Sequence, residues 1–124
     1  NISPSRIEAK LDIEPEISQS MLYGDFKNYL VAIIVPNKEL ALEWAKENNI
    51  ESNLTSIIKE NSYNKKIKEV VDKVNKNLSA IEQIRKFILI DHEFTIENNM
   101  MTPSMKVRRF KVKDKYKESL EKLY

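Results

Sequence analysis

The order of hydrophobic and polar positions predicts a β-hairpin near the start of the chain. Two segments, Ile17–Tyr23 and Tyr29–Val35, are rich in residues that favour extended structure. The five residues between them include the single glycine and have the composition of a turn. The second strand is apolar at every position from Leu30 to Val35, so we expect it to be covered on both faces, and Pro36 to end it.

Helical periodicity dominates the next part of the chain. Apolar residues at three- and four-residue steps predict a helix from Asn37 to about Asn48. A second helix is predicted around Leu54, Ile57 and Ile58. The clearest apolar stripe predicts a packed surface helix, and its members are Tyr63, Ile67, Val70, Val71, Val74, Leu78 and Ile81.

The two ends of the chain complete the pattern. Ser3 as N-cap and Pro4 at the first helical position predict a short helix to about Leu11, with Ser5 and Glu8 as an alternative capping box. Near the other end, an apolar run predicts a buried strand at 87–90, and a polar stretch follows at 93–99. A last helix is indicated by Val112, Tyr116, Leu120 and Leu123. The sequence therefore predicts one α+β domain, 1–124, with a small sheet containing a β-hairpin and packed by several helices.

Composition excludes several kinds of function. Hydrophobic residues make up 41% of the 124 and charged residues 32%, which is typical of a folded globular domain. The 21 basic and 19 acidic side chains nearly cancel, so we expect no nucleic-acid partner. With no cysteine and only His92, no metal site is predicted.

No segment of the sequence predicts a membrane span. The longest apolar run, from Leu30 to Val35, falls far short of the roughly 20 residues a spanning helix needs. A basic signal-peptide region is missing at the start. We expect a cytoplasmic protein, for which peripheral membrane association stays open.

The informative motif is an octet near the end of the chain. Residues 102–109, Thr-Pro-Ser-Met-Lys-Val-Arg-Arg, resemble the terminal lysine motif of adenylate-forming enzymes in its long-chain fatty acid–CoA ligase (acyl-CoA synthetase) form. Residues 1–8, Asn-Ile-Ser-Pro-Ser-Arg-Ile-Glu, are similar to the second half of that family's hinge motif. Three further segments, 21–25, 29–36 and 78–87, also resemble long-chain synthetases, in the same order, so that the resemblance covers nearly the whole chain.

The resemblance implies a mobile C-terminal lid domain that is inactive alone. Its partner would be an N-terminal adenylate-binding domain that precedes Asn1, where no initiator methionine stands. The intact enzyme would use ATP, CoA and Mg²⁺ to convert a fatty acid into acyl-CoA, and no cofactor is expected to be bound to this chain by itself. Substrate chain length stays open.

The resemblance also assigns roles to individual residues. Lys106 matches the family lysine that stabilises the charge developing where the carboxylate attacks ATP. The segment Asn1, Ile2, Ser3 and Pro4 would border the pantetheine tunnel in the second half-reaction. Arg108 and Arg109 match basic residues that could hold the lysine loop or attract the phosphates of CoA.

The chain departs from the family pattern at three positions. Arg6 stands where the broad family has glutamate, and Met105 stands where many relatives place glycine. Asn99 also takes the place of a common glycine, which asparagine partly imitates because it tolerates left-handed backbone conformations.

Two other functions stay open. The chain could belong to an enzyme that adenylates another carboxylate, because the acyl pocket of this family lies in the large domain. Alternatively, the basic run from Lys106 to Lys117, with aromatic Phe110 and Tyr116, could serve a small nucleic-acid-binding module. Val112 and Tyr116 fit the core face of the last helix better than such a patch.

Overall fold

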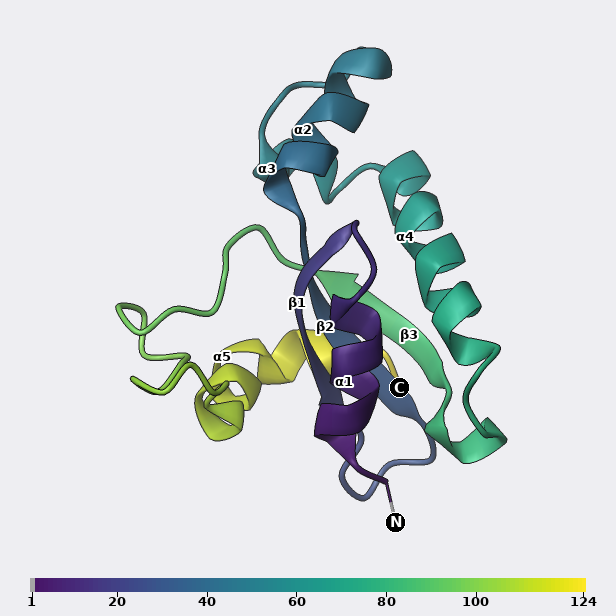
Figure 1. Ribbon diagram of the computed structural model, residues 1–124, viewed down its shortest axis with the longest axis vertical. Helices are drawn as coiled ribbons and strands as arrows, with labels where there is room; N and C mark the ends of the chain where they lie inside the picture. The colour runs from purple at the N-terminus through teal and green to yellow at the C-terminus, as the bar shows by residue number, and fades with distance from the viewer. Residues whose placement is uncertain (1) are drawn as a thin grey trace.

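The computed structural model describes residues 2–124 and confirms the α+β domain. Its elements, in chain order (Figure 1), are α1 (Pro4–Asp12), β1 (Ile17–Tyr23), β2 (Leu30–Pro36), α2 (Lys38–Glu47), α3 (Leu54–Ile57), α4 (Asn61–Asn75), the 3₁₀ helix η1 (Ala80–Glu82), β3 (Ile84–Leu89) and α5 (Arg109–Glu121). The three strands form one sheet in the order β1-β2-β3. β1 and β2 are antiparallel, whereas β2 and β3 are parallel.

The predicted hairpin is confirmed, with Tyr23 opposite Val31 next to the turn. β2 is buried along its whole length because it lies centrally in the sheet. Gly24 does not have a positive φ. A Cβ at this position would lie 2.6 Å from Leu30 Cδ2 and 3.3 Å from the Tyr29 carbonyl oxygen, so a larger residue would require the Leu30 side chain to move. The left-handed conformation of the turn falls on Phe26 (φ 61°).

Helices α1 and α2 begin where the sequence predicts, but only one of the predicted N-caps forms its side-chain hydrogen bond. Asn37 caps α2, and its Oδ1 accepts a hydrogen bond from the Leu40 N–H at 3.1 Å. Ser3 takes the extended N-cap conformation of α1 and Pro4 begins the helix, but the Ser3 side chain makes no capping hydrogen bond. The alternative capping box of Ser5 and Glu8 is wrong, because the helix begins before Ser5 and the Glu8 carboxylate bonds elsewhere.

The long stripe ends earlier than predicted. α4 stops at Asn75, and Ile81 lies on η1 with 69% of its surface exposed. The Asn75 side chain causes this change of direction: its Oδ1 accepts from the Ile84 N–H (2.9 Å) and its Nδ2 donates to the Ile84 carbonyl (2.8 Å). The same contacts start β3 at Ile84, three residues before the predicted strand.

Two hydrophobic clusters lie on opposite faces of the sheet. The first includes Ile34 and is built with α1, α2 and α4; the second includes Ile33 and is built with α5 and the segment before it. Figure 1 shows α1 in front of the hairpin and α5 behind it. Neighbouring residues of β2 therefore anchor both layers, because successive side chains of a strand point to opposite faces.

Candidate functional site

Lys106 lies in a tight turn that projects from a short two-stranded stem. Met101 and Val107 pair as an antiparallel bridge at the base. The Thr102 N–H donates to the Lys106 carbonyl (2.8 Å), and the Met105 N–H donates to the Thr102 carbonyl (2.9 Å). Thr102 Oγ1 also accepts from the Lys106 N–H at 3.1 Å. These bonds fix the backbone at Lys106 although the turn is exposed.

Met105 has a left-handed backbone conformation with φ of 65°, and its side chain is 64% exposed. This conformation is costly for a residue with a Cβ and is free for glycine. The structure thus explains the place of the family glycine, because the turn requires a positive φ immediately before the lysine. Asn99 satisfies a similar demand with φ of 69°, as predicted for asparagine.

The Lys106 side chain is exposed, and no described residue pairs with its ammonium group. Some other cations are engaged: Lys27 pairs with Glu121, Lys73 with Glu14 and Lys113 with Asp25. A compact charge on a flexible stem, carried by a fixed turn, can be presented to an anion outside this domain.

Arg108 holds the base of the turn. Its backbone N–H donates to the Met100 carbonyl at 2.7 Å, and its Nη1 donates to Asn99 Oδ1 at 2.7 Å. Met100 below is buried and belongs to the second hydrophobic cluster. Arg108 therefore bonds to the residues just before the lysine turn, as it would if it held this turn in place.

Arg109, the first residue of α5, forms a bidentate ion pair with Glu8 of α1. Nη1 donates to Glu8 Oε2 at 2.7 Å, and Nη2 donates to Glu8 Oε1. Glu8 Oε2 accepts a further hydrogen bond from the Leu22 N–H of β1 at 2.7 Å. The hydrogen bonds to Glu8 raise the pKa of Arg109 above its ordinary value, although burial of the guanidinium opposes the shift.

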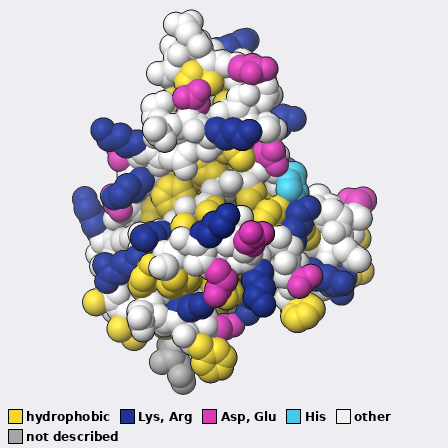
Figure 2. All heavy atoms as spheres, turned by 180° about the vertical axis from the view of Figure 1, so that it is seen from behind, with side chains coloured by type: hydrophobic (Ala, Val, Ile, Leu, Met, Phe, Trp, Pro, Cys, Tyr) yellow, Lys and Arg dark blue, Asp and Glu magenta, His cyan; other side chains and the backbone are white. Residues whose placement is uncertain are grey.

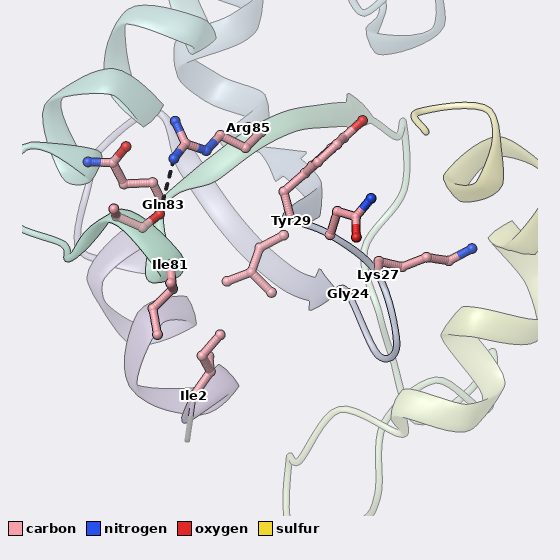
Figure 3. A pocket seen from close by; sticks show the side chains of 10 residues that line it. Ile2, Gly24, Lys27, Tyr29, Ile81, Gln83 and Arg85 are labelled. Carbon is pink, nitrogen blue, oxygen red and sulfur yellow. Dashed lines mark hydrogen bonds between the residues drawn. The ribbon is translucent and has the colours of Figure 1, made fainter.

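The segment that resembles the hinge motif lies at the start of α1. Asn1 falls outside the described residues, and Ser3 and Pro4 are exposed. Ile2 lines a hollow of about 380 Å³ together with the hairpin turn, η1 and the start of β3. Figure 3 shows Ile2 and Ile81 on one side of this hollow and Lys27 on the other.

The cations at this hollow differ in their engagement. The Lys27 ammonium bonds to Glu121 at 2.7 Å and is turned away from the hollow (Figure 3). Arg85 donates from Nη2 to the Ala80 carbonyl at 3.1 Å and is exposed. The hollow thus offers a mixed polar and apolar wall next to the hinge-side end of α1.

The predicted site residues fall into two groups. Lys106, Arg108 and Arg109 lie on consecutive parts of one segment, which Figure 1 shows bulging away from the sheet before α5. Ile2, Ser3 and Pro4 lead into and begin α1, whose N-terminal end points to the bottom of Figure 1. The domain therefore carries two candidate surfaces, one around the lysine turn and one at the hinge-side end of α1.

The sequence did not predict a polar network in the segment between β3 and the lysine turn. Tyr116 OH and His92 Nε2 lie 2.6 Å apart, and His92 Nδ1 and Asp91 Oδ1 lie 3.0 Å apart. Thr55 Oγ1 donates to Asp91 Oδ2 at 2.9 Å. The hydrogen bond from His92 lowers the pKa of Asp91, while burial and the Asp91 charge raise the pKa of Tyr116 to about 12. The network ties α3 and α5 to the segment that follows β3.

The face shown in Figure 2 carries charges of both signs. Figure 2 shows lysine and arginine side chains interleaved with aspartate and glutamate across the face it presents. Within the Lys106–Lys117 run, Val112 is fully buried and Tyr116 is bound to His92, while Phe110 is 79% exposed. Val112 thus lies in the core as predicted.

Residues 2–124 lack two further features. No three acidic or histidine side chains gather closely enough there to hold a metal ion. Within the same residues, no helix has the length and apolar character needed to cross a bilayer.

The chain is similar to known proteins along its whole length. A family model described as "AMP-binding enzyme C-terminal domain" matches residues 1–124. The probable acyl-activating enzyme 16, chloroplastic, of Arabidopsis thaliana is 35% identical over 126 positions, which cover 100% of this chain and 17% of that protein. A long-chain-fatty-acid–CoA ligase of Mycobacterium tuberculosis is 29% identical over 100% of this chain and 21% of its own length.

A solved structure shares the fold along the same range. The A-PCP didomain of carboxylic acid reductase from Segniliparus rugosus, in complex with AMP, matches 99% of this chain and 16% of its own with a TM-score of 0.76 and 29% identity. The chain thus spans about a fifth or less of the length of each of these relatives.

Proposed function

This chain belongs to the family of AMP-binding enzyme C-terminal domains, and we propose that it is the mobile lid of a long-chain fatty acid–CoA ligase. In the first half-reaction the fatty carboxylate attacks the α-phosphate of ATP, which gives acyl-adenylate and pyrophosphate. In the second, the thiol of CoA attacks the adenylate and releases AMP. The lid would contribute a different surface to each step, and the large domain would bind ATP with Mg²⁺ and the acyl chain.

The observation that carries this proposal is the free ammonium of Lys106 on a fixed, exposed turn. Negative charge accumulates where the carboxylate meets the phosphate, so a preorganised cation there lowers the barrier. Three hydrogen bonds fix the turn, and two of them involve the Lys106 backbone. The Lys106 side chain makes no ion pair with any described residue that would have to break. Its role is electrostatic stabilisation and not proton transfer.

The hinge-side surface would serve the second half-reaction. The hollow beside Ile2 lies next to the exposed start of α1 and has both apolar and polar walls, which suits the mixed chemistry of a pantetheine arm. Ser3 and Pro4 would border the same path. Arg85 would supply the cation of this surface, since Arg109 is engaged by Glu8. Arg108 and Arg109 would act by holding the lysine turn.

The test is Lys106→Ala in the full-length enzyme, with Lys111→Ala as the control for loss of an exposed lysine nearby. We expect acyl-adenylate formation, measured as ATP–pyrophosphate exchange with palmitate, to fall about 10²- to 10³-fold. Thioester formation from pre-made palmitoyl-adenylate and CoA should change by less than about threefold, because the lysine serves one orientation only. Lys111→Ala should leave both rates near those of the wild type. An equal loss in both half-reactions would contradict this division.

A second candidate is another carboxylate-adenylating enzyme that does not pass its acyl group to free CoA. The observation in its favour is the structural similarity, at 29% identity, to a carboxylic acid reductase. The same wild-type assays separate the two functions. Palmitoyl-CoA formation supports the ligase, whereas adenylation without any thioester on CoA favours the second candidate.

A further inference from the structure

We infer that Glu8 is a positioning residue for Lys106: through Arg109 it locks the lysine turn to α1, so that both move as one rigid unit. This inference rests on the proposed lid function and adds to it a mechanical connection. A lid that brings one lysine to one site must hold that lysine in a fixed position relative to the rest of the domain. The structure supplies such a connection between α1, which starts at the hinge-side segment, and the segment that carries Lys106 and leads into α5.

Glu8 is the buried centre of this connection. Only 7% of its surface is exposed. Both carboxylate oxygens accept hydrogen bonds from Arg109, and Oε2 also accepts the Leu22 N–H at 2.7 Å. Two parallel bonds from a planar guanidinium fix orientation as well as distance. The contact therefore holds α5 against both α1 and β1.

The path from Arg109 to Lys106 is short and stiff. Only two residues separate them, and both are bonded: Val107 bridges Met101, and the Arg108 N–H donates to the Met100 carbonyl at 2.7 Å. Arg108 also binds Asn99 on the opposite side of the stem. A displacement of Arg109 is thus transmitted to the lysine turn.

The path from Glu8 to the hinge-side segment is equally direct. α1 begins at Pro4, so Glu8 lies about one helical turn from its start. Ile7 and Leu11 are completely buried in the first hydrophobic cluster and fix the helix to the sheet. One turn of helix and one ion pair therefore separate the hinge-side segment from the lysine stem.

The other ion pairs of α1 and its flank do not make this connection. Arg6 pairs with Glu82 of η1, and Lys73 of α4 pairs with Glu14. Within residues 2–124, the Arg109–Glu8 pair is the salt bridge that joins α1 to the segment carrying Lys106. Its removal should loosen the lysine turn without touching the hinge-side surface.

The experiment compares Glu8→Gln and Arg109→Lys in the full-length enzyme, with Lys73→Gln as the control for loss of an exposed ion pair. Glu8→Gln keeps the shape of the side chain, and Arg109→Lys keeps the charge but loses the fork. Four quantities are measured: ATP–pyrophosphate exchange with palmitate, thioester formation from palmitoyl-adenylate, KM for CoA, and the thermal midpoint.

We expect exchange to fall about 10- to 100-fold in both variants, since small misplacement of a catalytic group has effects of this size. Thioester formation and KM for CoA should stay within roughly threefold of the wild type, and Lys73→Gln should stay within roughly twofold in every assay. Arg109→Lys retains the charge pair, so its rate of ATP–pyrophosphate exchange should fall less than that of Glu8→Gln.

Two results would overturn the inference. Variants with a lowered thermal midpoint but normal exchange would show that the pair only stabilises the fold. A raised KM for CoA in Arg109→Lys, with Glu8→Gln unaffected, would make Arg109 a phosphate ligand instead. A wild-type enzyme without palmitate-dependent exchange would instead refute the proposed function.

Discussion

Two residues with left-handed backbones shape the lysine stem, and they meet this demand in different ways. Asn99 (φ 69°) uses its side chain, whose Oδ1 accepts from Arg108 Nη1 at 2.7 Å. Met105 (φ 65°) gains no such bond, since its thioether has no hydrogen-bond donor and is only a weak acceptor. The strain at Met105 is therefore uncompensated locally and is held by the hydrogen bonds of the turn.

Met105→Gly should make the domain more stable than Met105→Ala by roughly 1 kcal/mol, because glycine removes the Cβ that alanine keeps. Both variants lose the same long side chain, so the comparison isolates the backbone term. Urea denaturation of the two proteins measures the difference. An alanine variant as stable as the glycine variant would show that the turn relaxes to a negative φ.

At the scale of elements, α2 and α4 meet through two aromatic side chains. The rings of Trp44 and Tyr63 lie 5.0 Å apart between centroids, at an interplanar angle of 59°. Tyr63 is only 1% exposed, and burial of its phenol, with a smaller contribution from the Glu16 charge, raises its pKa to about 12. Ionised tyrosine is thus disfavoured in the folded state.

This shift predicts an alkaline loss of stability that Tyr63→Phe should reduce. The unfolded phenol releases its proton near pH 10, whereas the folded one holds it to about pH 12. The folded state binds more protons between these values, so its stability falls as pH rises from 10 to 12. Urea denaturation should show that the free energy of unfolding of Tyr63→Phe depends less on pH over this range than that of the wild type. At pH 7 the two free energies should be similar. Equal slopes in the two proteins would show that Tyr63 does not titrate late.

At the scale of the whole molecule, one strand joins two hydrophobic clusters. Ile34 of β2 packs with the layer of α1, α2 and α4, and Ile33 packs with α5 and the lysine segment. Met100 and Val107, which flank the lysine turn, lie in or against the second cluster. The position of Lys106 therefore depends on the core as well as on its own turn.

Ile33→Ala should lower the free energy of unfolding by about 2 to 5 kcal/mol, because Ile33 is completely buried and its truncation leaves a cavity. Phe110→Ala is the matched control on the surface, where the side chain is 79% exposed, and should change stability by less than about 0.5 kcal/mol. Circular dichroism during urea denaturation measures both. A small loss for Ile33→Ala would mean that the second cluster contributes little to the fold.

The sequence by itself determined the features that depend on neighbouring residues. The hairpin, the apolar β2 and the cap of α2 at Asn37 follow from local composition and periodicity. The lysine turn belongs with them, because its octet carries the resemblance and its left-handed position falls on the residue that replaces a glycine. These signals are readable because the responsible atoms lie within a few residues of each other.

Only the tertiary structure decided which distant segments meet. At the end of α4, the Asn75 side chain bonds to the backbone of Ile84 at the start of β3, nine residues away. The parallel pairing of β3 with β2 likewise joins segments that are far apart in the sequence. The pairing of Glu8 with Arg109 joins residues 101 positions apart. Periodicity carries no information on such contacts, because this partly buried ion pair depends on the packing of three elements and not on the sequence around either partner.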